Sequence, residues 1–111
     1  MEVVEEMIRL RELLDKRGIA WEDNSEDSKD ITDLWICRTR FKFNGLEVSC
    51  INGFATYGGF HGCNPGDGNM GLLEAWIEGF EPIGWQTADE VFEKLERMKR
   101  VSERKNDGTI N

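Results

Sequence analysis

Residues 58–71, GGFHGCNPGDGNMG, combine residue types that could bind a phosphate or a metal ion. They hold six of the twelve glycines of the chain, its only histidine, His61, and one of its three cysteines, Cys63. Residues 66–71 also spell G-x-G-x-x-G, which binds dinucleotides where a strand leads directly into the glycine turn and a helix follows. The preceding strand is expected to end near Tyr57, well before these glycines. We therefore expect no nucleotide site here.

A zinc site is the second possibility for the same stretch. Cys37 and Cys50 lie diagonally on one face of a predicted hairpin, and with His61 and Cys63 they could supply tetrahedral ligands. The sequence has no C-x-x-C pair, however, and reduced cysteines are among the most frequently buried residues. We therefore expect Cys37 and Cys50 in the core, and predict no metal and no cofactor.

Three aromatic residues are candidate anchors for a binding partner: Tyr57, Phe60 and Trp76. Tyr57 and Phe60 lie at the start of the glycine-rich segment, and long connections of this kind are usually functional or disordered. Exposed aromatic side chains contribute strongly to protein interfaces. The loop is therefore either a contact element or a plain connection, and the sequence leaves both open.

The charge of the chain is unevenly distributed. The formal net charge is −8, and residues 43–93 contain no Lys or Arg but eight Asp or Glu residues. We expect these carboxylates to form one anionic surface that binds a basic protein, since such surfaces steer association with basic partners. The same charge argues against direct nucleic-acid binding. The residues predicted for the contact face are Asp67, Glu74, Glu78 and Glu81.

Two alternatives to this interaction protein remain open. A metal-dependent hydrolase or nuclease could use Asp67, Glu74, Glu78 and His61, although the segment offers no Lys for the chemistry. A homo-oligomeric structural or regulatory protein, such as a homodimer, is the other.

The elements that position these residues begin with an amphipathic helix over residues 2–17, stopped by Gly18. A short edge strand over 19–21 and a mobile loop over 22–30 follow. Asn44-Gly45 then predicts a type I′ hairpin turn. The resulting register places Phe43 opposite Leu46, Phe41 opposite Val48, Thr39 opposite Cys50 and Trp35 opposite Phe54 on the core face, and Lys42 opposite Glu47, Arg40 opposite Ser49 and Arg38 opposite Ile51 on the other.

The second half of the chain supplies another strand and a helix. We favour a strand over a helix for residues 71–80, and a connector for 81–85 that Pro82 keeps irregular. Thr87 and Glu90 form a capping box at the start of the last helix. The fold is therefore predicted as α+β: an antiparallel sheet of three to four strands flanked by an N-terminal and a C-terminal helix. Residues 1–105 form one domain and 106–111 a frayed tail.

The composition suggests a cytoplasmic protein. No apolar run reaches the roughly 20 residues of a membrane helix, and the acidic N-terminus is unlike a signal peptide. Three cysteines do not form a dense disulfide framework, so we expect reduced thiols.

The motifs TYGGFHG, GLLEAWIEG and IGWQTADEVF resemble those of small phage and prophage accessory proteins of gut bacteria, which share a Tyr-Gly turn, a GLLE-like strand and a GW-T-A-E-VF helix start. The resemblance covers residues 45–95, and the NPGDG insert at 64–68 departs from it. It implies a protein acting in the host cell cytoplasm. Small acidic phage proteins of this type include anti-CRISPR inhibitors, which implies a host defence nuclease as the partner.

Overall fold

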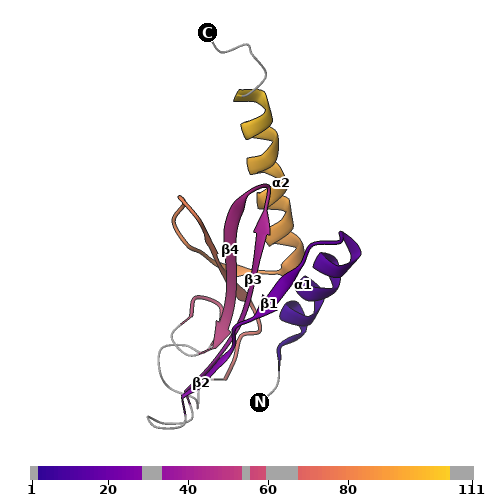
Figure 1. Cartoon of the computed structure of the whole chain (residues 1–111). Coiled ribbons are helices and arrows are strands. Elements are labelled where there is room, and N and C mark those ends of the chain that lie inside the picture. Colours follow the sequence, from indigo (N-terminus) through magenta and orange to yellow (C-terminus); the bar gives the residue numbers. More distant parts are fainter. Residues whose placement is uncertain (1–2, 29–33, 54–55, 60–67, 106–111) are drawn as a thin grey trace.

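The computed structural model describes residues 3–28, 34–53, 56–59 and 68–105. It confirms an α+β fold, with one helix near each end of the chain and an antiparallel sheet between them (Figure 1). The elements are α1 (Glu5–Lys16), β1 (Trp21–Asp23), β2 (Glu26–Ser28), β3 (Leu34–Phe43), β4 (Leu46–Gly53), β5 (Leu73–Ile77), β6 (Ile83–Gln86) and α2 (Ala88–Lys105).

The sheet is wider than the sequence predicts. Its order is β1-β3-β4-β5-β6, and β2 pairs with β3 beyond β1. All neighbouring strands are antiparallel. Because β1 and β2 lie one after the other along the same edge of β3, the sheet has five strand positions rather than three or four.

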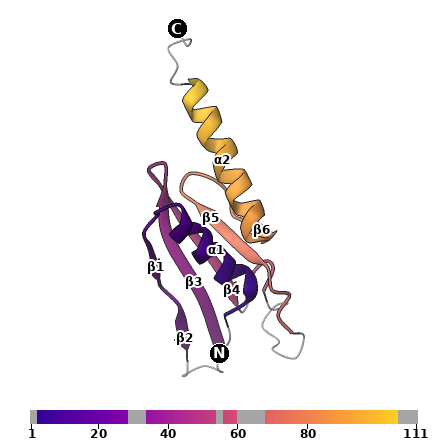
Figure 2. The same cartoon turned by 90° about the vertical axis from the view of Figure 1, so that its right-hand side faces the viewer.

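Both helices pack on one face of the sheet (Figure 2). Met7, Leu10 and Leu14 of α1 and Val91, Phe92 and Leu95 of α2 are buried there against inward-facing side chains of β3, β4 and β5. Phe92 lies 6.3 Å, between ring centroids, from both Phe41 and Phe43. The other face of the sheet is covered by neither helix. We call it the outer face.

The predicted hairpin is confirmed in its register. The observed partners include Phe43 with Leu46, Thr39 with Cys50 and Arg38 with Ile51, as the Asn-Gly turn requires. Asn44 has a φ of 52°, which a type I′ turn needs. Phe54, predicted opposite Trp35, lies outside the described residues.

Two predicted irregular segments are strands. In the segment 22–30, expected as a loop, β1 and β2 bond to the free edge of β3, and Asp23 pairs with Arg11 at 3.4 Å. In the segment 81–85, expected as a connector, β6 begins directly after Pro82. A proline is tolerated at the start of an edge strand, because it removes no ladder hydrogen bond there.

The helix ends follow their sequence signals. Gly18, with a φ of 69°, ends the turn after α1. At α2, the Glu90 amide donates to Thr87 Oγ1 and the Thr87 amide donates to Glu90 Oε1, so the capping box is confirmed. Glu6 of α1 also accepts the Ala88 amide at 2.7 Å, which ties the start of α2 to α1. The predicted tail, 106–111, lies outside the described residues.

Candidate functional site

The outer face is built from alternate residues of adjacent strands. Directly opposed residues of an antiparallel pair lie on the same side of a sheet. The strand register therefore gives three rows across the outer face: Lys42, Glu47 and Glu78; then Glu22, Arg40, Ser49 and Trp76; then Arg38, Ile51 and Glu74.

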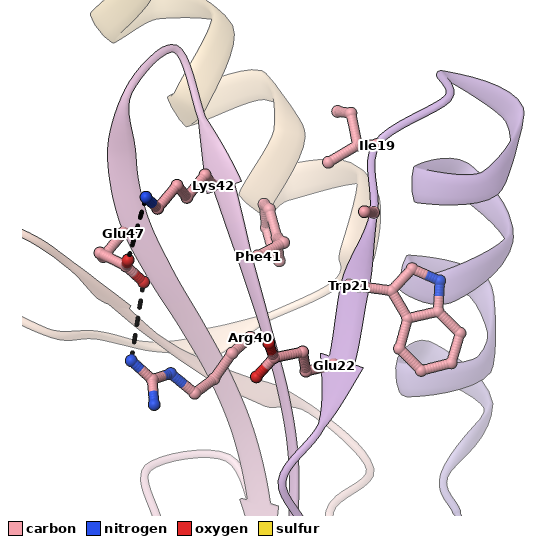
Figure 3. A pocket seen from close by; sticks show the side chains of 8 residues that line it. Ile19, Trp21, Glu22, Arg40, Phe41, Lys42 and Glu47 are labelled. Carbon is pink, nitrogen blue, oxygen red and sulfur yellow. Dashed lines mark ion pairs between the residues drawn. The ribbon is translucent and has the colours of Figure 1, made fainter.

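Two basic side chains of β3, Arg40 and Lys42, are partly neutralised within the chain. Glu47 lies 3.6 Å from Arg40 and 3.8 Å from Lys42, and Figure 3 shows Arg40 directed towards Glu47 rather than towards Glu22. These groups are about half exposed, and Lys42 more so. Exposed pairs of this kind contribute little to stability. They leave both cations accessible to a partner.

Glu74 is the main correction to the predicted contact face. It is only 4% exposed, so it cannot meet a partner directly. Its Oε1 accepts the Tyr57 amide at 2.6 Å, and its Oε2 accepts the Trp76 indole N–H. The carboxylate thus holds the backbone of one predicted anchor and the ring of another. Its role is to position aromatic residues.

Trp85 joins this arrangement from β6. The β5–β6 register shifts between Leu73 and Ala75, so that Gly84 and Trp85 together oppose Glu74 as a bulge. The Trp85 amide donates to the Tyr57 carbonyl at 2.9 Å, and the two ring centroids lie 5.3 Å apart. The contact requires glycine at 84, where an added Cβ would lie 2.3 Å from Tyr57 Cβ.

The backbone of Trp85 is unusual. Its φ is 51°, and Asn44 is the only other non-glycine residue with positive φ in the described ranges. Asn is common in this conformation, whereas a bulky side chain there is an outlier. Such strain costs on the order of 1–3 kcal/mol and clusters at functional sites.

Tyr57, Trp76 and Trp85 are therefore connected: the rings of Tyr57 and Trp85 are in contact, and Glu74 joins the Tyr57 backbone to the Trp76 ring. We call these three residues the aromatic platform. Their exposed fractions are 59%, 48% and 53%. Half-exposed rings of this size leave roughly 300 Å² of aromatic surface in contact with water, the scale of patch that is often functional. Sequence reasoning proposed Tyr57 and Trp76 as anchors, and that role stays a prediction. It did not include Trp85, because nothing in the sequence IGW indicates a bulge.

An open hollow adjoins the platform. Its lining includes two aromatic residues, Trp76 and Phe80, two carboxylates, Glu47 and Glu78, and Arg40, which pairs with Glu47. Phe80 is half exposed. Aromatic faces and carboxylates both attract cations. The hollow thus suits a lysine or arginine side chain.

The described carboxylates of segment 43–93 do not all gather on one face, as the expected anionic surface requires. In the described chain, Asp89 pairs with Arg9 and Glu93 with Arg97, while Glu90 caps α2. These three lie on or against the helices, away from the outer face. The predicted contact residues Glu78 and Glu81 are exposed and have no cation partner within the described residues. Bases from outside residues 43–93 pair with Glu47, Asp89 and Glu93, which a count of charges along the sequence could not show.

The residues of the catalytic alternative do not assemble in the described part of the chain. Asp67 and His61 lie outside it, as do Phe60 and Cys63. Both oxygens of Glu74 are bonded to N–H donors, and Glu78 Oε1 accepts the Glu47 amide at 3.0 Å. Among the described residues, no three His, Cys, Asp or Glu side chains gather as they would around a metal ion.

Cys37 and Cys50 are buried free thiols in the core, as predicted from the sequence. Burial raises the pKa of Cys50 to about 12.

The end of the glycine-rich segment leads into a strand. Gly71 is followed by β5, where a dinucleotide site would need a helix. The Met70 amide donates to the Gly59 carbonyl and the Leu72 amide to the Gly58 carbonyl, so the two described ends of the segment pair with each other. Asn52 and Asn69 fasten this pairing to β4 through reciprocal amide hydrogen bonds.

No family model, curated protein or solved structure matches the chain. The resemblance to phage accessory proteins therefore stays a prediction. No helix in the described ranges is long and apolar enough to cross a membrane.

Proposed function

We propose that this chain is a non-enzymatic interaction protein whose docking surface is the outer face of the sheet. The aromatic platform supplies the anchors, and Glu78, with Glu81 nearby in sequence, supplies acidic contacts. The partner presents lysine or arginine side chains among apolar ones. This proposal keeps the basic partner predicted from the sequence but moves the contact from an acidic surface to an aromatic one.

The observation that carries the proposal is the use of Glu74. Glu74 is only 4% exposed, and both of its carboxylate oxygens accept hydrogen bonds from neutral N–H donors. Here the two bonds fix Tyr57 and Trp76, whose rings are about half exposed and so contribute less to the core than buried rings would. Holding exposed aromatic rings rigid before binding reduces the entropy lost in a complex. Glu74 would therefore serve binding as well as stability.

The strained backbone of Trp85 supports the same conclusion. A glycine would adopt a φ of 51° without strain. Tryptophan at this position is therefore unfavourable for the backbone, and half of its ring remains in water. Tryptophan and tyrosine are the residues most enriched among those that dominate binding energy.

The identity of the partner is a finer proposal. The resemblance to phage accessory proteins and the charge of −8 support a host defence nuclease, since nucleases bind nucleic acid with Lys and Arg side chains. On this proposal the protein acts in the host cytoplasm and blocks a basic channel, in the manner of an anti-CRISPR protein. The pairing of the described carboxylates makes the platform, rather than an extended nucleic-acid mimic, the element that binds.

The test is affinity capture with variants matched for stability. Trp85→Gly removes the ring but relieves the backbone, so its unfolding free energy should stay within about 1 kcal/mol of wild type. Ile8→Ala removes an exposed apolar side chain from α1, on the other side of the protein, and serves as the control. Partners captured by wild type and Ile8→Ala should be depleted at least about 10-fold by Trp85→Gly.

A set of captured proteins that is the same for all three baits would refute the platform. The finer proposal has its own assay, in which the protein is titrated into cleavage reactions of purified RNA-guided nucleases. Inhibition by wild type and Ile8→Ala, but not by Trp85→Gly, would support it. No inhibition of any nuclease would leave the docking surface in place and remove the defence role.

A further inference from the structure

We infer that, when no other basic protein occupies it, the outer face binds a second copy of this chain, packed sheet against sheet in a two-fold dimer. The inference rests on the proposed function of the outer face as a docking surface and gives that surface a second ligand. It follows from how charge is arranged on the three central strands.

The outer face is basic on one side and acidic on the other. β3 presents Arg40 and Lys42, while β5 and the residue after it present Trp76 and Glu78. Between them, β4 presents the small side chain of Ser49 in the middle row. The cations and the groups that attract cations are thus on either side of β4, two strand spacings or about 10 Å apart.

A two-fold axis parallel to the strands and above β4 makes this face complementary to itself. Such an axis places β3 of one copy opposite β5 of the other, because it exchanges the two sides of β4. Lys42 then meets Glu78 of the second copy, and Arg40 meets the ring of Trp76, a favourable cation–π pair. Ser49 meets its own copy at the axis, where a small side chain permits close packing.

The alternative two-fold arrangement is unfavourable. An axis across the strands would place β3 opposite β3, with Arg40 and Lys42 facing the same cations of the second copy. Like charges opposed at an interface cost several kcal/mol in general. The charge pattern therefore selects the axis parallel to the strands, and with it the usual aligned packing of two sheets at about −30°.

Glu47 does not oppose this arrangement. It would lie near its own copy, but Arg40 and Lys42 flank it within 4 Å. On the three central strands, two copies together bring four cations, Arg40 and Lys42 from each, to four carboxylates, Glu47 and Glu78 from each. These charges balance one another, while Glu22 lies on β1, outside the three central strands.

The outer face is large enough for a dimer. The strands are 3 to 10 residues long, and at about 3.3 Å per residue and about 4.8 Å between strands they cover roughly 500 Å². Two copies would therefore bury about 1,000 Å² in total, the lower limit for a specific interface.

The experiment uses opposite charge reversals. Lys42→Glu and Glu78→Lys are each made alone, and their masses in solution are measured by light scattering after size exclusion at low salt. Each variant should self-associate at least about 100-fold more weakly than wild type, because two like-charge pairs form in each dimer. An equimolar mixture should form a heterodimer, since both pairs are then of opposite charge.

Lys16→Glu, which makes the same charge change on α1, is the control and should dimerise like wild type. Circular dichroism checks that each variant folds. Because the Lys42 side chain is strongly exposed, we expect Lys42→Glu to fold like wild type. A monomeric wild type, a dimeric Lys42→Glu, or a mixture that stays monomeric would overturn the second copy as partner.

The same measurements separate this inference from the proposed function. If wild type is monomeric but captures another protein that Trp85→Gly loses, the outer face binds a different protein and the proposed function stands. If capture is also insensitive to Trp85→Gly, both are wrong.

Discussion

Replacing Glu74 by alanine should destabilise the protein by about 2 kcal/mol. The change leaves the Tyr57 amide without its acceptor, and an unsatisfied buried donor costs about 1–3 kcal/mol. The Trp76 indole loses its acceptor too, but it is half exposed and can bond to water, so it adds less. Releasing a buried carboxylate returns part of this cost. For a chain of this size, 2 kcal/mol corresponds to a fall of roughly 8 °C in melting temperature.

The assay is urea unfolding followed by far-ultraviolet circular dichroism, with near-ultraviolet spectra for the tryptophans. Glu74→Gln keeps one acceptor but turns an amide N–H₂ towards the other donor, so its loss should be about half as large, near 1 kcal/mol. Glu81→Ala, which removes an exposed carboxylate, is the control and should change stability by less than about 0.5 kcal/mol.

The near-ultraviolet spectrum should also weaken in Glu74→Ala, because Trp76 loses a fixed orientation. A stability within about 0.5 kcal/mol of wild type, together with an unchanged spectrum, would refute the positioning role of Glu74. The platform would then be held by packing alone.

Three further predictions concern other parts of the fold. The Thr87 bonds hold the pKa of Glu90 below its usual 4.5, so its stabilising effect is present above that pH and lost below it; thermal melts of Glu90→Gln should therefore depend less on pH between about 5 and 3. The Cys50 thiol, with a pKa of about 12, should resist alkylation at neutral pH in the native protein and react once guanidinium unfolds it; fast native labelling, shown by mass spectrometry, would contradict its burial. Gly84→Ala should destabilise by about 1–3 kcal/mol in urea melts and perturb the near-ultraviolet spectrum, because its Cβ would overlap Tyr57 Cβ; a variant as stable as wild type would show that the bulge can relax.

Local signals in the sequence predicted much of the fold. Asn44-Gly45 fixes the hairpin register, because the turn and the alternation of side chains act on adjacent residues. The capping box at Thr87 is equally local. The predicted edge strand over 19–21 overlaps β1 at Trp21. By contrast, β2 forms because β3 offers a free edge, and its polar sequence, EDS, carries no apolar alternation. Pairing with β3 determines such a strand, and the local sequence alone does not indicate it.

The candidate site was predicted less well, for related reasons. Charge counted along the chain could not show that Arg9 would reach Asp89, 80 residues away. Glu74 looked like a surface carboxylate, since nothing nearby in sequence announces the Tyr57 amide as its partner. Tyr57 and Trp76, proposed as anchors from the sequence, are exposed, and their role in a contact stays a prediction.

The left-handed backbone conformation of Trp85 means that selection for stability and selection for binding favour different residues at this position. A library screened only for resistance to heat or protease should drift towards glycine or asparagine at this codon, since these residues adopt such a conformation at little cost. Lineages that keep an indole there would reveal continuing use of the surface. The identity of residue 85, in natural variants and in laboratory selections, thus indicates whether binding by this surface is still under selection.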